Sequence, residues 1–427
     1  MTWLFLLNLL TPLGLCGIIF NKKILEREQI TKSFKSAFSL ILALLILTTG
    51  VLSGCDNKSD DTSATTTATT DEAVTTTEAT TTASNTTTPT ADSTTIEKGN
   101  EDMEMLCEKY LLESTNDKTD VTEKIEAMLN EHGACVLGSG VFYVSGIDMP
   151  EGSTLMGMGH ASEIILKSSV RDGYAVKLGS ECTIKNLAVL GGTDKISLPA
   201  EVGKRHGILF KGTANSTSDP QPHNSIVESC FVRSFEGGGI TCEDTGYATS
   251  SSITASNCHI TNCGAAINIP FFSEYHEFTN MLCVYNLYGC INNGGNNTFV
   301  NCGFNSNKVG FLIDNAQRQS KNNSHGSVIG CTFNHTDSNK GIGIKLLNAQ
   351  YGYVFTGCQM WYSEIFVENS TNITFSNFNF GGEQKITVKG GKFVMFSNCV
   401  FFGDPTVNTD SNTKFINCFT SNGVVVE

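Results

Sequence analysis

Three ionisable side chains in the C-terminal half of the chain, Asp314, Lys345 and Glu368, alternate with apolar neighbours in short segments. Successive side chains of a strand point to opposite faces, so these three groups are expected to face away from a core. Two carboxylates that flank a sugar bond can perform acid and base chemistry, and a cation between them would keep one ionised. The pattern predicts Asp314 and Glu368 as a catalytic pair with Lys345 between them. A solvated polar sheet face would show the same pattern.

Two loops beside these segments carry further candidates. The first loop holds Glu274 and Glu277, with His276 between them, and the second, after the Asp314 segment, holds Arg318 and His325. Both loops are expected to leave the same sheet edge, so an acid, an arginine and a histidine could converge there as a general acid or base with substrate-binding groups. Packed or solvated loop residues are the competing interpretation for each of them.

Neutral groups complete the predicted binding surface. Asn293 lies in an Asn/Gly-rich run that suits neutral sugars, and Trp361 and Tyr362 could stack on sugar rings from the opposite edge. Glu243 is expected on the same outward face, at one end of it. Neither a metal-ligand cluster nor a cofactor motif is evident, so no metal or cofactor is expected.

An internal repeat with a period near twenty residues must position these groups. In most repeats Asn or Gly, which tolerate a left-handed backbone, precedes a key apolar column. Apolar columns three residues before and two after that column can share one core only if the chain turns between them. The key column reads Cys230, Cys258, Met281, Cys302, Cys331, Cys358, Phe378, Cys399 and Cys418.

Each repeat is therefore predicted to be a strand, a one-residue corner, a second strand and then a third strand. This favours an all-β fold, a right-handed parallel β-helix of about ten rungs with three strands per rung, over a β-sandwich. An N-terminal capping helix is expected over residues 120–132, with Asp120 or Thr119 at its start and Gly133 at its end. The column cysteines are interpreted as small buried hydrophobes, because stacked parallel side chains rarely reach disulfide geometry.

The stacked-Asn corner resembles the pectate-lyase-like superfamily. The segment Thr119–Gly159 resembles the N-terminal entry of its phage-tailspike and glycosidase-like members, and the likeness covers about residues 118–427. The resemblance implies a substrate groove on the third sheet and makes a homotrimer possible. It leaves the reaction open, because the fold hosts lyases, hydrolases, transferases and adhesins. The polygalacturonase-type motif is not intact, since Ser324-His325-Gly326 matches it only in part.

The N-terminal residues predict export and a lipid anchor. Lys32 and Lys35 precede an apolar run that ends in Leu52-Ser-Gly-Cys55, which resembles a bacterial lipobox with Cys55 as the lipid attachment site. An ordinary membrane helix is the alternative. Three regions are expected: a leader and lipoprotein signal peptide over 1–55, a Thr-rich disordered linker over 56–98, and the β-helix domain over 99–427. The predicted location is the extracellular face of a bacterial membrane.

The charge balance limits the partners. Lys and Arg number 28 against 42 Asp and Glu, a net charge of −14, which disfavours a nucleic-acid binder. The favoured function is a carbohydrate-active enzyme that cleaves or rearranges glycosidic bonds of a polysaccharide, as a hydrolase, a lyase or a fructan-type transferase. The alternative is a non-catalytic glycan-binding or adhesion module on a lipid-anchored stalk.

Overall fold

The computed structural model describes residues 109–115, 117–192, 198–212, 222–245, 250–315 and 324–426. All of them belong to one compact unit, Pro89–Glu427. The predicted leader, Cys55 and the Thr-rich linker lie outside the described residues. Within the described ranges, no helix is long and apolar enough to cross a membrane.

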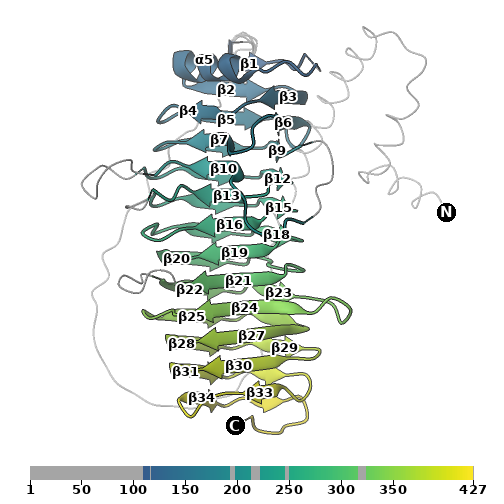
Figure 1. Ribbon diagram of the computed structural model, residues 1–427, viewed down its shortest axis with the longest axis vertical. Helices are drawn as coiled ribbons and strands as arrows, with labels where there is room; N and C mark the ends of the chain where they lie inside the picture. Colours follow the sequence, from purple (N-terminus) through teal and green to yellow (C-terminus); the bar gives the residue numbers. More distant parts are fainter. Residues whose placement is uncertain are drawn as a thin grey trace, which may run out of the picture. The chain divides into compact units, whose positions relative to one another are not determined.

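The chain winds into a coil whose three faces are parallel sheets (Figure 1). The face that begins each rung, sheet A, has thirteen strands: β1 (Leu111–Leu112), β2 (Ala134–Leu137), β5 (Thr154–Gly157), β8 (Thr183–Lys185), β11 (Ile226–Glu228), β14 (Thr254–Ser256), β17 (Glu277–Thr279), β20 (Gly295–Val300), β22 (His325–Ile329), β25 (Tyr353–Thr356), β28 (Thr371–Ser376), β31 (Lys392–Ser397) and β34 (Thr413–Ile416).

Sheet B follows sheet A within each rung and has two parts. Its strands are β3 (Gly140–Val144), β6 (Ser162–Leu166), β9 (Ala188–Leu190), β12 (Phe231–Arg233), β15 (His259–Thr261) and β18 (Leu282–Val284), then β23 (Thr332–Asn334), β26 (Gln359–Trp361), β29 (Asn379–Gly381), β32 (Val400–Phe401) and β35 (Phe419–Thr420). Single bridges through Gly303 connect Leu282 to Thr332, so the two parts form one face.

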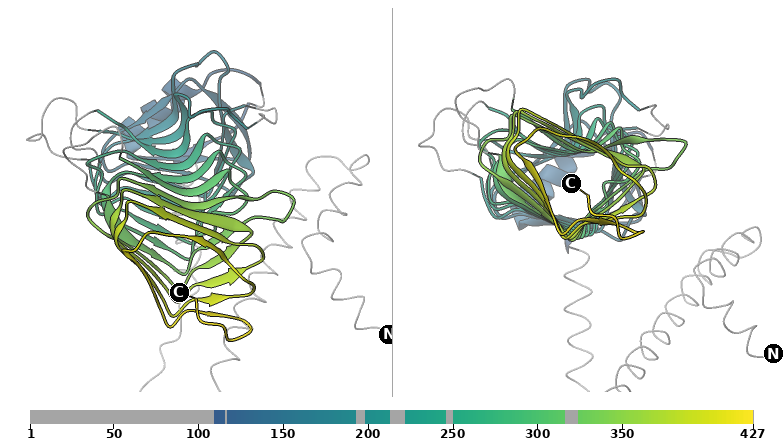
Figure 2. Two further views of the ribbon diagram at one scale, coloured as in Figure 1. Left: turned by 60° about the horizontal axis from the view of Figure 1, so that its bottom comes forward. Right: turned by 90° about the horizontal axis from the view of Figure 1, so that it is seen from below.

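Sheet C is the third face and has eleven strands. They are β4 (Ile147–Met149), β7 (Gly173–Leu178), β10 (Arg205–Phe210), β13 (Gly238–Cys242), β16 (Ala265–Ile269), β19 (Tyr288–Asn292), β21 (Val309–Asp314), β24 (Gly341–Leu347), β27 (Ser363–Glu368), β30 (Lys385–Lys389) and β33 (Thr406–Asn408). Seen end on, the three sheets surround one interior (Figure 2). Buried side chains of one hydrophobic cluster occupy it. The predicted right-handed parallel β-helix is confirmed.

The corner between sheets A and B is the turn that the repeat predicted. Its residues have positive φ in most rungs: Asn186, Ser229, Asn257, Asn280, Asn301, Gly330, Gly357, Asn377, Asn398 and Asn417. Their side chains are partly or largely exposed, and Nδ2 of Asn280 donates to Oδ1 of Asn257 at 3.4 Å. The column therefore matters chiefly for its backbone conformation.

This corner yields a stability prediction. Asn280 has φ of 54°, so Asn280→Val is expected to destabilise the protein by about 1–2 kcal/mol, because a β-branched residue is strained in that region. Asn280→Gly, in contrast, should change stability by less than about 0.5 kcal/mol. Urea unfolding of both variants measures the difference, and equal losses would show that the side-chain ladder, and not the backbone, decides stability there.

The core contains the predicted cysteines together with stacked phenylalanines. All thirteen cysteines of the described residues are free and buried. Beside them phenylalanine rings stack from rung to rung, for example Phe278 on Phe299 at 5.0 Å and Phe375 on Phe396 at 4.7 Å between ring centroids. Helix α5 (Thr122–His132) covers the N-terminal end with Ile125 and Leu129, and Gly133 ends it with φ of 69°.

A second, buried ladder lies at the corner between sheets B and C and was not predicted. Asn286 accepts the N–H of Cys263 at 2.9 Å, and Asn307 accepts the N–H of Asn286 at 2.8 Å. In the next rung the ring of His335 contacts the carbonyl of Asn307 and the hydroxyl of Ser363. These side chains satisfy backbone groups that the corner removes from the sheets.

Candidate functional site

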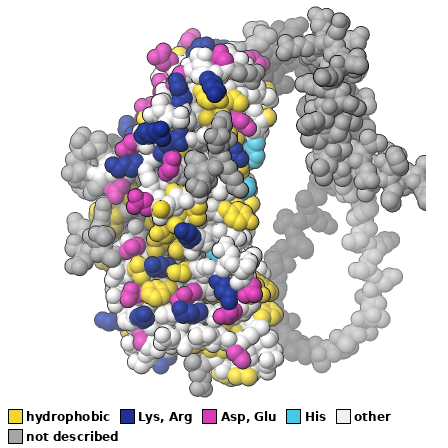
Figure 3. Space-filling model, turned by 45° about the vertical axis from the view of Figure 1, so that its right-hand side comes forward, with side chains coloured by type: hydrophobic (Ala, Val, Ile, Leu, Met, Phe, Trp, Pro, Cys, Tyr) yellow, Lys and Arg dark blue, Asp and Glu magenta, His cyan; other side chains and the backbone are white. Residues whose placement is uncertain are grey.

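The outward face of sheet C is the surface that the sequence predicted as the site. The predicted inward residues of its strands are buried: Ile267, Ile269, Phe311, Ile313, Ile344, Leu346, Ile365, Val367, Ile386 and Val388. Their alternating neighbours therefore point outward. On the face of the coil in Figure 3, acidic, basic and apolar side chains are interspersed.

Asp314 and Glu368 are the last residues of β21 and β27, on the outward face. In the strand register Leu347 of β24 is aligned between them. Two rung steps place their backbones about 9–10 Å apart. The predicted position of Lys345 is wrong, because Lys345 aligns with Leu312 and Phe366 and so lies in the neighbouring outward column. In the strand register the residue between the two carboxylates is thus Leu347, and not Lys345.

The structure does not bring Glu277 together with Asp314, because the two lie on different sheets. Glu277 begins strand β17, where Phe278 points inward, so Glu277 is exposed on the outward face of sheet A. Glu274 lies at the turn from sheet C to sheet A and accepts a hydrogen bond from Nδ2 of Asn296 at 3.3 Å. The expected convergence with Asp314 is wrong for Glu277, because Glu277 already belongs to sheet A, whereas Asp314 ends a strand of sheet C.

The predicted binding residues also separate onto different faces. Oδ1 of Asn293 accepts the backbone N–H of Asp314 at 2.9 Å and so positions that strand end. His325 begins β22 of sheet A, next to Gly295. Trp361 lies on sheet B, 40% exposed, with its ring stacked on Phe402 at 6.2 Å. Tyr362 lies at the turn to sheet C with φ of 49°. Arg318 lies outside the described residues.

A groove of about 500 Å³ opens farther toward the N-terminal end of sheet C, across β7, β10, β13 and β16. Its polar lining includes Asp172, Tyr174, Lys204, His206, Thr241, Glu243, Asp244 and Asn268. Tyr174 and His206 are direct neighbours on adjacent strands. This groove gathers more ionisable side chains than the surface between Asp314 and Glu368.

The carboxylate of Glu243, in this groove, is contacted at both of its oxygens. Nζ of Lys177 lies 3.0 Å from Oε1 of Glu243, and the N–H of Gly212 donates to Oε2 at 2.9 Å. Lys177 also lies over the ring of Tyr174 at 5.4 Å, and the phenol donates to Oδ1 of Asp148 at 2.6 Å. Burial and the hydrogen bond to Asp148 raise the pKa of Tyr174, so the phenol keeps its proton.

His206 is a neutral donor in this groove. Its Nδ1 accepts the N–H of Gly238 at 2.9 Å and lies 3.3 Å from the hydroxyl of Thr241. Burial lowers the pKa of His206, although Asp172 opposes the shift. The neutral ring therefore carries its proton on Nε2. The groove combines the Glu243 carboxylate, the neutral Nε2–H donor of His206 and the Tyr174 oxygen as an acceptor, which is a set suited to binding hydroxyl-rich ligands.

The groove was not predicted from the sequence, although Glu243 was expected on the outward face. The rungs before residue 226 lack the cysteine column, so their outward positions could not be aligned by the repeat. Tyr174 and His206 lie in strands that the repeat did not include. The available signal was alternation alone, in Tyr174-Ala-Val-Lys177 and in His206-Gly-Ile-Leu209.

His276, a loop candidate, is a buried structural residue with 1% exposure. Its Nδ1 accepts the N–H of Ile253 at 3.1 Å, and Nε2 lies 2.7 Å from the hydroxyl of Ser273 and 3.9 Å from Sγ of Cys242. Burial lowers the pKa of His276 to about 3. This histidine binds protons in the unfolded chain at pH values where the folded protein keeps it neutral.

His276 predicts acid sensitivity. Its contribution to stability is complete above the unfolded pKa of 6.5 and decreases as the pH falls from there toward 3. Between pH 7 and pH 4 the protein should lose about 2–3 kcal/mol more stability than His276→Gln does. Urea unfolding at several pH values measures this, with the exposed His160→Gln as control. Parallel pH curves for the protein and His276→Gln would contradict it.

No group of three or more His, Cys, Asp or Glu that could hold a metal ion occurs among the residues that the structure describes.

Comparison with known proteins supports the fold. No protein-family profile matches the sequence, and no curated protein sequence matches it. Among solved structures, the chain is similar to a DFA-IIIase from Arthrobacter chlorophenolicus A6 in complex with GF2, with a TM-score of 0.52 and 11% identity, over 75% of this chain and 97% of that one. It is also similar to the A-module of the mannuronan C-5 epimerase AlgE6 from Azotobacter vinelandii, with a TM-score of 0.49 and 14% identity, over 73% and 89% of the two chains. The chain thus has the right-handed parallel β-helix fold expected from the pectate-lyase-like resemblance.

Proposed function

We propose that this protein acts on a polysaccharide bound along the outward face of sheet C, with the Glu243 groove as its reaction centre. The observation that carries the proposal is the groove itself, where a held carboxylate, a protonated phenol and a neutral imidazole meet in about 500 Å³. Glu243, whose Oε1 lies 3.0 Å from Nζ of Lys177, serves as the base or nucleophile. Nε2 of His206 donates a hydrogen bond to a sugar oxygen, and the Tyr174 oxygen, whose proton is donated to Asp148, accepts one from a sugar hydroxyl.

The surface beyond the groove supports a long ligand. One outward column continues from the groove residues Thr241 and Asn268 through Ile291, Leu312, Lys345 and Phe366, at one residue per rung. Rungs repeat about every 4.8 Å, which is close to the length of one sugar unit. A polymer lying parallel to the coil axis could thus contact successive rungs, and Asp314 and Glu368 flank the same path.

The proposal extends to location. The lipobox-like Leu52-Ser-Gly-Cys55 and the Thr-rich segment after it support a module tethered by a lipid at Cys55 to the outer face of a bacterial membrane. A homotrimer, as in the tailspike-like members of the fold, is part of the same proposal.

A second function, non-catalytic glycan binding, is favoured by one observation. Several ionisable groups of the groove already pair with each other: Lys177 with Glu243, Tyr174 with Asp148, and Lys204 with Asp172. Incubating the full-length protein with a panel of neutral and acidic polysaccharides and analysing products by mass spectrometry separates the two functions. Products from at least one glycan support the enzyme, and binding without products on any glycan supports the binding module.

A further inference from the structure

A second cavity, of about 720 Å³, lies on the outward face of sheet A near the C-terminal end of the coil. It spans strands β28, β31 and β34 and is separate from the sheet C groove. The residues that form its floor and rim include Asn372, Lys392, Phe393, Met395, Asn412 and Lys414.

Phe393 is the unusual residue of this cavity. It is 76% exposed and has φ of 57°. The equivalent position one rung earlier is Asn372 with φ of 59°, and two rungs earlier it is Gly352 with φ of 97°. Asn and Gly are the residues that this backbone conformation favours, whereas a bulky aromatic residue there is strained. Phe393 is thus not a core residue, and its side chain does not suit the backbone conformation of this turn.

The strand register places polar groups on both sides of the ring. Asn372 lies one rung before Phe393 and Asn412 one rung after it, since Thr371 pairs with Lys392 and Val394 pairs with Thr413. Met395 and Lys414 form the neighbouring outward column. An exposed ring between two amides, in a concave surface, matches a sugar, which offers an apolar C–H face and a ring of hydroxyl groups.

The charged side chains that line the cavity indicate which class of sugar it would bind. Lys392 and Lys414 line it, and among the described residues its lining contains no acid. The nearest acid along the chain, Asp410, does not line the cavity. Its carboxylate instead accepts the N–H groups of Gly391 at 2.8 Å and Asn412 at 3.1 Å. Two ammonium groups beside an aromatic platform favour a ligand with carboxylates.

We propose that this cavity is a binding site for an acidic oligosaccharide, with one uronate-type ring stacked on Phe393 and its carboxylate, or that of a neighbouring unit, held by Lys392 and Lys414. The site does not depend on the function proposed for sheet C. The exposed ring of Phe393 contributes nothing to the core, and its backbone conformation is strained, so the residue is available to a ligand.

The test uses the full-length protein and titration calorimetry with three probes: a 1,4-linked galacturonate hexamer, a mannuronate hexamer and maltohexaose. At least one uronate hexamer should bind more tightly than maltohexaose. Phe393→Asn should weaken that binding by about tenfold or more while the melting temperature stays equal or rises, because asparagine suits the backbone. Lys392→Gln combined with Lys414→Gln should remove the preference for the acidic probe.

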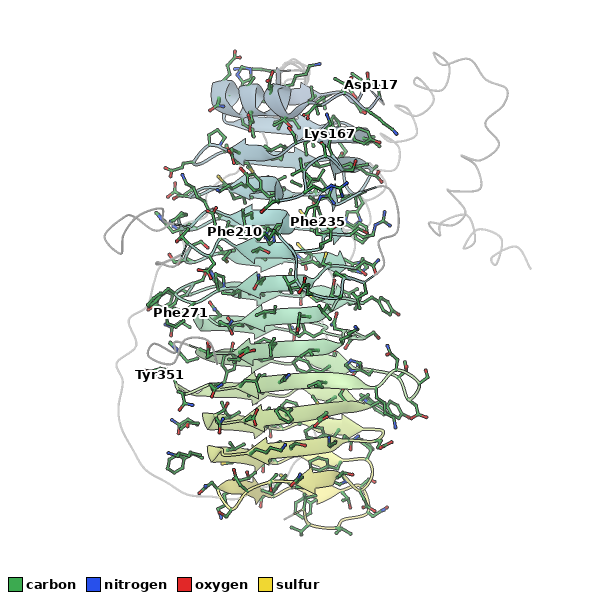
Figure 4. All side chains as sticks on the ribbon, in the orientation of Figure 1. Asp117, Lys167, Phe210, Phe235, Phe271 and Tyr351 are labelled. Atoms are coloured by element: carbon green, nitrogen blue, oxygen red, sulfur yellow. The ribbon has the colours of Figure 1, made fainter. Side chains whose placement is uncertain are left out.

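Two matched variants complete the design. Tyr351→Ala removes another exposed aromatic at the edge of the coil that does not line the cavity (Figure 4), and it should bind as the unmodified protein does. Glu243→Gln should also keep this binding, which separates the site from the sheet C groove. Unchanged affinity in Phe393→Asn, or no binding of either uronate hexamer, would overturn the proposal.

Discussion

Glu243→Gln is expected to lower the rate of glycan processing by about 100- to 10,000-fold, the range typical for loss of an acid or base group. Glutamine keeps the size of the side chain and can still accept the N–H of Gly212, but it loses the charge that faces Lys177. The fold should therefore be preserved while the reactive carboxylate is removed. Initial rates on the glycan identified in the product screen, together with thermal melting, measure the two effects separately.

The control for this variant comes from the other carboxylates. Glu277→Gln should leave the rate unchanged, because Glu277 is exposed on sheet A, outside the groove. Asp314→Asn is the informative comparison, since Asp314 ends β21 and Glu243 follows β13, three rungs apart on the same sheet along the proposed path. If Asp314→Asn abolishes activity and Glu243→Gln does not, the reaction centre lies at the Asp314 and Glu368 pair instead.

Phe299→Ala is expected to lower the free energy of unfolding by about 3–5 kcal/mol. Phe299 is fully buried, and its ring centroid lies 5.0 Å from that of Phe278, 5.2 Å from that of Phe311 and 6.0 Å from that of Phe304. Removing it leaves a cavity between rungs whose backbones are fixed by parallel pairing, so the neighbouring rings can move little to fill it. Urea unfolding followed by circular dichroism gives the value.

A surface aliphatic residue of the neighbouring strand provides the matched control. Ile329 lies in β22, points outward and is 40% exposed. Ile329→Ala removes a side chain of similar chemistry but leaves no cavity, so stability should change by about 0.5 kcal/mol or less. A loss below 1 kcal/mol in Phe299→Ala would mean that the rungs can collapse around the missing ring.

The local sequence pattern determined where each rung turns and which of its side chains face the core. The asparagine at 257 or 280 tolerates a left-handed corner, and with that corner the apolar residues around it share one core-facing side. Alternation in the third strand assigned Ile313 and Val367 to the core and Asp314 and Glu368 to the surface. Each of these assignments depends only on a residue and its immediate neighbours. They can therefore be made from a single sequence.

The relation between rungs was decided by the tertiary structure. Alternation shows which face Lys345 is on but not how far along its strand it lies, because outward positions recur every second residue. The register put Leu347, and not Lys345, between the two carboxylates, and β24 and β27 also shift register at Ile342. Loops of unequal length hide such offsets from the sequence, since they change no local pattern.

The register between distant strands also explains why the groove was not predicted from the sequence. Tyr174, Lys177 and Glu243 meet across three strands, although 66 residues separate Lys177 from Glu243 in the chain. By itself the sequence determined the repeating turn, the inward and outward faces and the capping helix, because each follows from the conformational preferences and polarity of adjacent residues. Only the tertiary structure decided which outward side chains meet, since parallel pairing of distant strands sets those distances.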